Sequence, residues 1–460
     1  MFVNRINEEK RIKDAIRSDR SVLIAVYGRR RCGKSTLLKR ILTGDDIYFV
    51  ADQREKSLQI ESFAGSIERS VPGFSSARYP DWDAVFNNLH NSLKRRITIC
   101  IDEFPYLVKN EPGLPSILQK VVDNDTNEYF NLIICGSSQQ MMQNMILNSG
   151  SPLYGRCNEI LNIKPMSVKW FGEYFNCRPE KAITGYGILG GVPRYWELVK
   201  EKETVEEAVK HHILDSDGIL YKEPEVLFYD EMRTSVLAYS ILTLVGRGCN
   251  RLSEIASRLE KPATDLNRPV KLLVDLGYIR KETPFNISSR STKKSLYKIS
   301  DPFMNFYFTF VVPEKSRLEY GLKEEVWMEI TKKLNHYISG IWEGLCRDAV
   351  PAMNFKGMHF GEARRWWGNG IDNKAVEIDI AALAADGSSL LIGEAKWSEA
   401  IDAVKVFNKL KNKAQNLPFV KNRNIVYALF LKNKPEKVPG EPIIITPADI
   451  ISGKRPKTND

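Results

Sequence analysis

The sequence lacks any apolar run that could cross a lipid bilayer, which takes ~18 residues in a helix. One of the longest apolar stretches, residues 236–245 (VLAYSILTLV), is too short. The first residues, MFVNRINEEKRIK, mix charged with apolar side chains and so lack the apolar core of a secretion signal. We therefore expect a protein that stays in the cytoplasm and has no membrane partner.

Cysteines are few and are not arranged in pairs. The seven are scattered along the chain, and no two form a C-x-x-C motif. This argues against a disulfide framework and against a cysteine-based zinc site. Several lie inside apolar runs such as ITICIDE and LIICGSS, where a reduced cysteine behaves as a small hydrophobic residue.

Length and charge set the next limits. A chain of 460 residues is longer than one hydrophobic core usually serves, so we expect two to four domains. The net charge is +10, and residues 401–460 hold 12 Lys and Arg against 5 Asp and Glu. A basic excess favours a polyanionic partner such as nucleic acid. The alternative is a solvated, lysine-rich surface.

Four segments differ in their patterns. Residues 1–165 alternate short apolar runs with helical patterns, which predicts an α/β core with a parallel sheet. Residues 166–230 predict helices, and residues 231–312 predict three helices and a β-hairpin, the order of a winged helix. Residues 325–460 predict a helix, a β-hairpin, a lysine-rich helix and a strand. The strands expected in the first segment are Val22–Tyr27, Ile47–Ala51, Ile97–Ile101, Leu132–Cys135 and Glu159–Ile163.

A phosphate-binding loop occupies residues 28–35, where GRRRCGKS matches G-x-x-x-x-G-K-[ST] between a strand and a helix. In this motif the glycines let main-chain N–H groups surround the phosphates. We expect Lys34 to neutralise the β and γ oxygens of ATP and Ser35 to hold Mg²⁺. The residues expected to contact the nucleotide here are Gly28, Arg29, Arg30, Arg31, Cys32, Gly33, Lys34, Ser35 and Thr36.

Two further strands supply candidate hydrolytic groups. The strand ITICI ends in Asp102 and Glu103, which we expect to hold the magnesium through water and to activate the attacking water, respectively. Ser137, after the strand LIIC, is positioned to read the γ-phosphate or to orient the water, although a plain strand exit would look the same. Arg156 is either a finger on the nucleotide or the partner of an acidic surface residue.

These segments together resemble the archaeal-type ATPase family, a branch of the AAA+ and signal-transduction P-loop ATPases. The resemblance rests on GRRRCGKSTLLKR, IDEFPYLV, IICGSS with MMQN, and SPLYGR, in that order. It implies a helical lid in which Pro193, within GGVP, lies near the adenine. It continues through DLGYIRKETPF and YKISDPFMNFYF into the C-terminal domain. One departure is that the second basic lid residue is not evident unless Arg194 serves.

The segment that predicts a winged helix offers a possible DNA reader. Residues 251–256 and 264–277 fit the last two helices, with Asn267, Arg268 and Lys271 facing outward. Pro269 predicts that the last helix begins close to it, because proline is favoured in the first turn. A role as lid or scaffold is the alternative to DNA contact.

A second site is predicted in the C-terminal hairpin. Glu377 and Asp379 share one strand face, as do Glu394 and Lys396, and only 15 residues separate Asp379 from Glu394. Two carboxylates and the carbonyl of Ala395 suit Mg²⁺ or Mn²⁺. Lys396 would orient or deprotonate the metal's water.

This arrangement resembles the PD-(D/E)XK nuclease core, accompanied by Glu343 on the preceding helix and by the sequence RWWG. The alternative is a charged edge hairpin without catalytic function. A lysine-rich helix follows, with Lys405, Lys409, Lys411 and Lys413, and suits a phosphate backbone.

Taken together, the sequence predicts an ATP-hydrolysing AAA+-like module with a helical lid and a winged helix. This module is fused to a metal-dependent DNA nuclease of restriction-endonuclease-like α/β fold. The rival is a nucleotide-controlled switch or scaffold whose C-terminal domain binds DNA or protein without cutting. A homo-oligomer follows if Arg156 acts on a neighbouring subunit.

Overall fold

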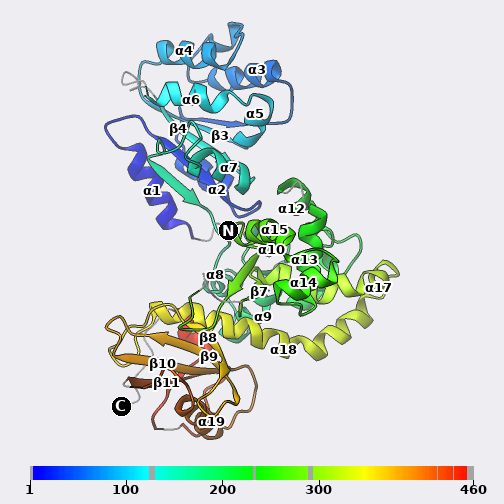
Figure 1. The fold of residues 1–460 in the computed structure, drawn as a ribbon. Coiled ribbons are helices and arrows are strands. Elements are labelled where there is room, and N and C mark those ends of the chain that lie inside the picture. Colours follow the sequence, from blue (N-terminus) through cyan, green and yellow to red (C-terminus); the bar gives the residue numbers. More distant parts are fainter. Residues whose placement is uncertain are drawn as a thin grey trace. The chain divides into compact units, whose positions relative to one another are not determined.

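The computed structural model describes residues 4–123, 130–231, 235–288, 294–421, 423–438 and 440–452. The chain divides into two compact units, coloured by sequence in Figure 1. The first holds residues 1–165 with the short pieces 192–194 and 229–231, and the second holds the rest. Within the described ranges no helix combines the length and the apolar character that crossing a membrane requires. All seven cysteines have free thiols.

The first unit is built on a five-stranded parallel sheet with strand order β2-β3-β4-β1-β5, which confirms the expected α/β core. Every residue of β1, β3 and β4 is buried. Such continuous apolar runs are typical of parallel strands covered on both faces. The strands are β1 (Leu23–Tyr27), β2 (Ile47–Val50), β3 (Ile97–Asp102), β4 (Phe130–Gly136) and β5 (Glu159–Asn162).

Helices cover both faces of this sheet (Figure 1). Under one face an aromatic cluster fills the core, with Phe63 at its centre. Its ring centroid lies 5.1 Å from that of Phe49, 5.3 Å from Trp82 and 5.9 Å from Phe86. The helices are α1 (Ile6–Ile16), α2 (Lys34–Ile41), α3 (Lys56–Ile67), α4 (Trp82–Ser92), α5 (Phe104–Asn110), α6 (Leu114–Asp123) and α7 (Gln139–Leu147).

Residues 166–231 are helical, with a sharp break at the two glycines of GGVP. Gly190 has a φ of +67°, and a Cβ on Gly191 would lie 2.1 Å from the carbonyl oxygen of Met166. The Met166 N–H also donates to the Gly191 carbonyl at 2.7 Å, so only glycine fits this approach. The helices are α8 (Val168–Phe175), α9 (Pro179–Leu189), α10 (Pro193–Glu197), α11 (Val205–His212) and α12 (Glu223–Glu231).

Three helices and an antiparallel pair of strands follow. The expectation that the third helix begins near Pro269 is wrong, because α15 starts at Ala263 and the proline lies inside it. Burial of Leu266, Val270 and Leu273 on one face of that helix outweighs the missing N–H. The elements are α13 (Ser235–Gly246), α14 (Leu252–Arg258), α15 (Ala263–Asp275), β6 (Ile279–Glu282) and β7 (Leu296–Ile299).

The C-terminal part contains a mixed sheet of order β12-β11-β10-β9-β8. The 27-residue helix α18 covers one face through residues such as Trp342, and α19 covers the other through residues such as Leu410. Strands β8 and β12 extend the predicted hairpin and last strand. The elements are α16 (Pro302–Phe306), α17 (Lys315–Glu319), α18 (Lys323–Ala349), β8 (Arg364–Asn369), β9 (Ala375–Leu383), β10 (Ser389–Lys396), α19 (Ala403–Gln415), β11 (Asn424–Leu431), β12 (Ile443–Ile445) and α20 (Pro447–Ser452).

We predict that Phe63→Ala lowers the free energy of unfolding of the first unit by about 3–5 kcal/mol, because it leaves a cavity among packed rings. Leu58→Ala on the same helix is the control, since Leu58 is 45% exposed. Chemical denaturation followed by tryptophan fluorescence measures both. A loss below about 1 kcal/mol for Phe63→Ala would contradict the central place of this ring.

Candidate functional site

The loop at residues 28–33 joins β1 to α2 and takes the shape its glycines allow. Gly28 has a φ of +148°, and a Cβ there would lie 2.3 Å from the carbonyl oxygen of Ile163. Gly33, with a φ of +87°, precedes the first residue of α2, and Arg31 also has a positive φ. The loop therefore bends tightly before the N-terminal end of the helix, where main-chain N–H groups favour phosphate.

Lys34 and a buried arginine fix this loop. The Lys34 Nζ is buried and donates to the carbonyl oxygens of Gly28 at 2.8 Å and Arg29 at 3.0 Å, across the loop. Arg5 supports the loop from its other side, because its Nη2 donates to the carbonyl oxygens of Cys32 at 3.1 Å and Lys164 at 2.6 Å. Sequence reasoning missed Arg5, which no motif used above contains.

Asp102 lies at the end of β3, beside the start of α2. Its Oδ2 accepts from the Ser35 hydroxyl at 2.6 Å and from the Tyr48 hydroxyl, and its Oδ1 accepts from the Glu103 N–H at 2.9 Å. Burial alone would raise the pKa of Asp102, but the hydrogen bonds from Ser35 and Tyr48 outweigh it and the pKa is lowered. The carboxylate is thus ionised next to the residue expected to hold magnesium. Tyr48, on β2, was not predicted.

Glu103 and Ser137 meet at the ends of neighbouring strands. The Glu103 Oε2 accepts from the Ser137 hydroxyl at 2.8 Å and from its N–H at 3.3 Å. Glu103 has a φ of +54° and comes directly before α5, so the chain turns sharply at this residue. Because parallel strands present their carboxyl ends at one edge, β1, β3 and β4 bring the loop, both acids and the serine together.

Three other residues are expected at the nucleotide, namely Arg156, Arg30 and Pro193. Arg156 forms a two-pronged ion pair with Asp123, with Nε–Oδ1 and Nη2–Oδ2 distances of 2.8 Å. A finger role for Arg156 requires this pair to open and stays a prediction. Arg30 donates to the Tyr106 hydroxyl at 3.2 Å. Pro193 is the first residue of α10, and its contact with adenine also stays a prediction.

Comparison with known proteins shows the family to which this chain belongs. Residues 2–199 match a family model described as an ATPase domain predominantly from Archaea. The chain is also 31% identical over 428 residues to an uncharacterized protein of Methanocaldococcus jannaschii, covering 90% of this chain and 92% of that one. The chain belongs to the archaeal ATPase family.

Two further matches of this archaeal ATPase bear on its two units. Residues 307–414 match a model described as archaeal and bacterial proteins of unknown function. A solved Walker-type ATPase of Pyrococcus abyssi is 19% identical, covers 67% of this chain and 96% of its own, and superposes with a TM-score of 0.52. That likeness shows the fold. With the family match over residues 2–199, the first unit of the archaeal ATPase is a P-loop ATPase domain.

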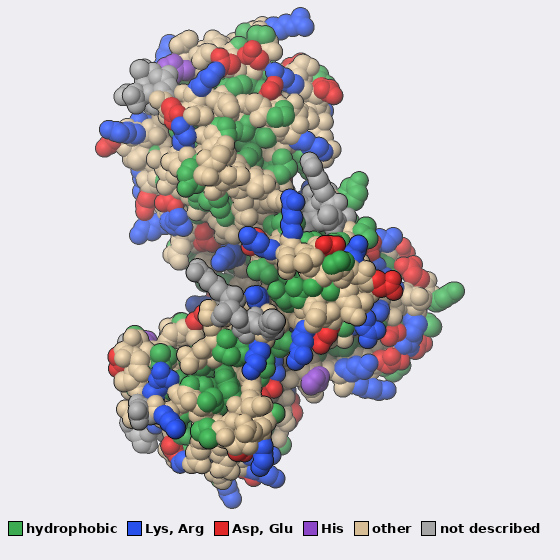
Figure 2. All heavy atoms as spheres, viewed as in Figure 1, with side chains coloured by type: hydrophobic (Ala, Val, Ile, Leu, Met, Phe, Trp, Pro, Cys, Tyr) green, Lys and Arg blue, Asp and Glu red, His purple; other side chains and the backbone are tan. Residues whose placement is uncertain are grey.

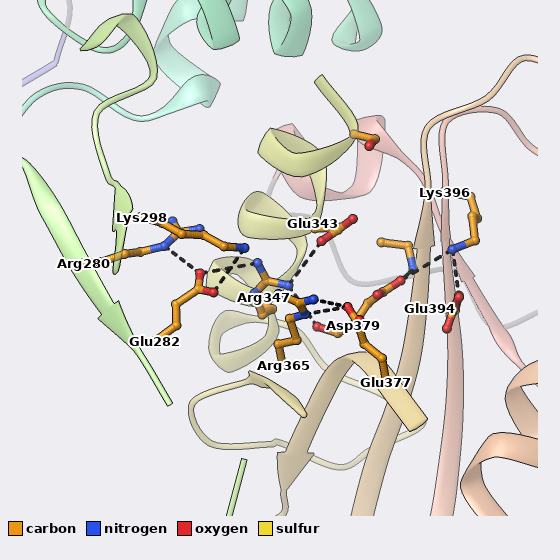
Figure 3. Close-up of polar contacts among 12 residues, drawn as sticks. Arg280, Glu282, Lys298, Glu343, Arg347, Arg365, Glu377, Asp379, Glu394 and Lys396 are labelled. Carbon is orange, nitrogen blue, oxygen red and sulfur yellow. Dashed lines mark hydrogen bonds and ion pairs between the residues drawn. The ribbon is translucent and has the colours of Figure 1, made fainter. Parts of the chain in front are cut away.

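The second candidate site of the archaeal ATPase lies between β9 and β10 (Figure 3). The last paired residues are Gly393 and Ile380, so Glu394 lies opposite Asp379 one step further in register. There the Asp379 Oδ2 accepts the Ala395 N–H at 3.0 Å in place of a main-chain oxygen. Asp379 and Glu394 are each only 7% exposed.

Two lysines reach these carboxylates. The Lys396 Nζ lies 2.8 Å from the Glu394 Oε1 and 3.7 Å from the Asp379 Oδ2. Lys413, on α19, donates to both Glu394 oxygens at 3.1 and 2.9 Å and was not foreseen in this role. Glu377 is not part of this group, because it pairs with Arg365 on β8 at 2.6 Å.

Mutual charge and burial shift the pKa values at this site. Burial, and then the charge of Glu394, raise the pKa of Asp379. Burial opposes the ammonium form of Lys396, but the two carboxylates outweigh it and raise its pKa. Without a bound cation the raised pKa makes Lys396 a poor base, and the choice between orienting and deprotonating the water stays a prediction.

The lysine-rich helix is partly used inside the protein. Lys413 binds Glu394, and Lys411, whose side chain is 44% exposed, pairs with Glu441 at 2.9 Å, while Lys405 and Lys409 are exposed. The expectation that this helix suits a phosphate backbone stays a prediction. On the face shown in Figure 2, Lys and Arg side chains of each unit are interspersed with Asp and Glu.

For the ATP site, we predict that Lys34→Ala abolishes nucleotide binding, because the phosphates lose their main counter-charge. Glu103→Gln should keep ATP bound yet lower turnover by about 10²-fold or more, since only activation of the water is removed. Nucleotide binding by calorimetry and phosphate release measure the two effects. Wild-type turnover by Glu103→Gln would show that another group activates the water.

A pH prediction follows from Asp102. Its lowered pKa contributes stability above the ordinary aspartate pKa, and this stability is lost as pH falls through the folded-state pKa. Tyr48→Phe removes one donor, so the pKa of Asp102 should rise and acid unfolding should begin at a higher pH. Unfolding followed from pH 7 to pH 2 tests this. Tyr79→Phe is the control, because the Tyr79 hydroxyl donates to the Phe74 carbonyl and accepts from the Asn88 Nδ2, and neither bond involves Asp102. Equal acid midpoints for the two variants would refute the link to Asp102.

Proposed function

We propose that this archaeal ATPase couples ATP hydrolysis in its first unit to metal-dependent cleavage of DNA in its second. In this proposal residues 166–230 form the lid, residues 231–312 form a winged helix, and residues 325–460 form a nuclease-like domain of the PD-(D/E)XK type. The observation that carries it is the convergence of Asp379, Glu394 and Lys396 on adjacent strands. The Lys396 Nζ lies 3.7 Å from the Asp379 Oδ2 and 2.8 Å from the Glu394 Oε1.

The donor set fits Mg²⁺ or Mn²⁺ in its chemistry. Two buried carboxylates face one another across β9 and β10, and their mutual repulsion favours the binding of a cation between them. Among the described residues no group of three or more His, Cys, Asp or Glu converges to hold a metal. A cation here would therefore take two carboxylates and complete its shell with main-chain oxygen, such as that of Ala395, and water. Once bound, it would polarise the phosphodiester.

The side chains of the site divide the remaining tasks. Asp379 and Glu394 bind the cation, and hydrogen bonding to the Ala395 N–H holds the Asp379 carboxylate in place. In this proposal Lys396 orients the attacking water and stabilises charge developing on the phosphate. Lys413 would have to release Glu394, at least in part, when a cation binds, because it contacts both carboxylate oxygens.

Nucleic acid is the proposed partner, and DNA is its proposed type. Asn267, Arg268 and Lys271 are exposed on α15, as a DNA-reading helix requires, and Lys405 and Lys409 are exposed on α19. Reduced cysteines are consistent with a cytoplasmic location. In a homo-oligomer, Arg156 would leave Asp123 and reach the nucleotide of a neighbouring subunit.

We predict that Asp379→Asn and Glu394→Gln each abolish Mn²⁺ binding at this site and DNA cleavage. Lys396→Met should retain the metal and lower cleavage by about 10²–10³-fold, because only charge stabilisation is lost. Because the three act as a unit, a triple variant should cost little more than the worst single change. Calorimetry with Mn²⁺ and cleavage of linear, branched and single-stranded DNA measure these effects.

Asp386→Asn is the matched control, since Asp386 lies in the turn between β9 and β10 and its side chain accepts from the N–H and hydroxyl of Ser388. ATP turnover should survive every one of these changes, because the loop at residues 28–35 lies in the other unit. Wild-type protein that cuts none of these substrates with Mg²⁺ or Mn²⁺, with or without ATP, would favour the switch or scaffold. Cleavage that persists in Asp379→Asn would place the chemistry elsewhere.

A further inference from the structure

The β6–β7 hairpin is packed onto the C-terminal sheet. The Phe285 N–H, just after β6, donates to the Arg365 carbonyl on β8 at 2.9 Å. The Phe285 ring is buried with Trp366 and Phe419 in the core under α19, and its centroid lies 5.4 Å from that of Phe419. A main-chain hydrogen bond and a shared core make the hairpin part of the same body as the sheet.

Glu282, the last residue of β6, carries a buried negative charge into this junction (Figure 3). Its side chain is 13% exposed and three cations surround it. The Arg280 Nε lies 2.9 Å and the Lys298 Nζ 3.2 Å from its oxygens, and the Arg347 Nη2 lies 4.0 Å away. Arg280 and Lys298 belong to the hairpin itself, but Arg347 belongs to α18.

Arg347 connects this charge to the candidate metal site. It lies in the last turn of α18, and its side chain is 8% exposed. Its Nη1 donates to the carbonyl oxygen of Asp379 at 3.0 Å, and Glu343 lies 3.9 Å away. Its Nη2 donates no hydrogen bond within the described part of the chain, so the charge of Glu282 is what holds that end of the guanidinium.

The contact with Asp379 falls where β9 stops pairing with β10, although β9 continues beside β8. Main-chain pairing with β10 stops at Ile380, and the Asp379 carboxylate binds the Ala395 N–H beyond that point. The main chain at Asp379 is thus fixed by Arg347 through its carbonyl, while the side chain faces Glu394. A small shift of the carbonyl would move the carboxylate relative to Glu394.

We propose that Glu282 and Arg347 are positioning residues for the Asp379–Glu394 site, which makes the β6–β7 hairpin a structural part of it. Glu282 orients Arg347, and Arg347 fixes the main chain of Asp379. Neither touches the metal or the substrate. This inference rests on the proposed metal site, and it adds that the site is complete only with the hairpin in place.

The test is Mn²⁺ binding to the full-length, nucleotide-free chain by calorimetry, after subtraction of what remains in Asp379→Ala. Arg347→Lys keeps the charge but loses the planar fork, and should weaken Mn²⁺ affinity about 10–100-fold, as removal of a group behind a metal ligand does. Glu282→Gln should weaken it in the same direction. Arg317→Lys is the matched control, because among the described residues Arg317 pairs with Glu314 and Glu329 alone, on a partly exposed surface.

The number of sites per chain separates positioning from misfolding. A positioning role lowers affinity at an unchanged number of sites, whereas partial unfolding lowers the number of sites and leaves affinity as it was. Raising Mn²⁺ should then restore cleavage by Arg347→Lys to within about two-fold of wild type, because the chemical groups are intact. Wild-type affinity in both Arg347→Lys and Glu282→Gln would overturn the inference.

The proposed function and this inference fail in different ways. Wild-type protein that binds Mn²⁺ through Asp379 but cuts no DNA would remove the nuclease, and the affinities of the two variants would still decide the positioning role. Wild-type protein in which Asp379→Ala changes no Mn²⁺ binding would overturn both.

Discussion

The hydrogen bond from Ser35 to Asp102 joins the first turn of α2 to the end of β3, and the ATP site depends on it. It requires β3 to lie where its carboxyl end meets the phosphate-binding loop, two strands away from β1 in the sheet. The strand order therefore determines the chemistry as much as the motif does. β4 lies between β1 and β3, and Ser137 at its end donates a hydrogen bond to Glu103. The order of the strands therefore gives each acid a hydrogen-bond donor from a neighbouring segment.

Asp102, at the end of β3, and Asp379, within β9, show two ways to keep a carboxylate buried in a sheet. Asp102 receives hydroxyl and N–H donors, which stabilise its charge, and its pKa is lowered. Asp379 receives one N–H and faces a second carboxylate, and its pKa is raised. Hydrogen-bond donors therefore stabilise the charge of the first carboxylate, whereas burial and a neighbouring carboxylate disfavour the charge of the second, even with the Lys396 Nζ 3.7 Å away. That difference suits the role expected of Asp102, which is to hold magnesium through water, and favours direct binding of a cation at the second site.

The sequence was informative where function imposes fixed spacing and uninformative where side chains meet through packing. The loop at residues 28–35 and the acids at 102 and 103 followed from local patterns, and so did the parallel sheet. Tyr48, Arg5 and Lys413 did not, because each reaches its partner from a distant segment whose approach depends on the whole core. Pro269 misled because local helix preference was overridden by burial of the apolar face of α15.

Burying the charged groups around Arg347 costs free energy, and their mutual pairing explains why the fold can keep them buried. Removing several charged groups from water is unfavourable unless each finds a partner, and here cations and anions alternate from Arg280 to Glu282, Arg347 and Glu343. An apolar replacement would pack without that cost, but it would donate nothing to the Asp379 carbonyl. Since the donor must be both long enough to reach β9 from α18 and fixed in direction, a planar guanidinium held by a buried carboxylate meets both needs. The hairpin that supplies this carboxylate is thereby tied to the geometry of a strand in another sheet.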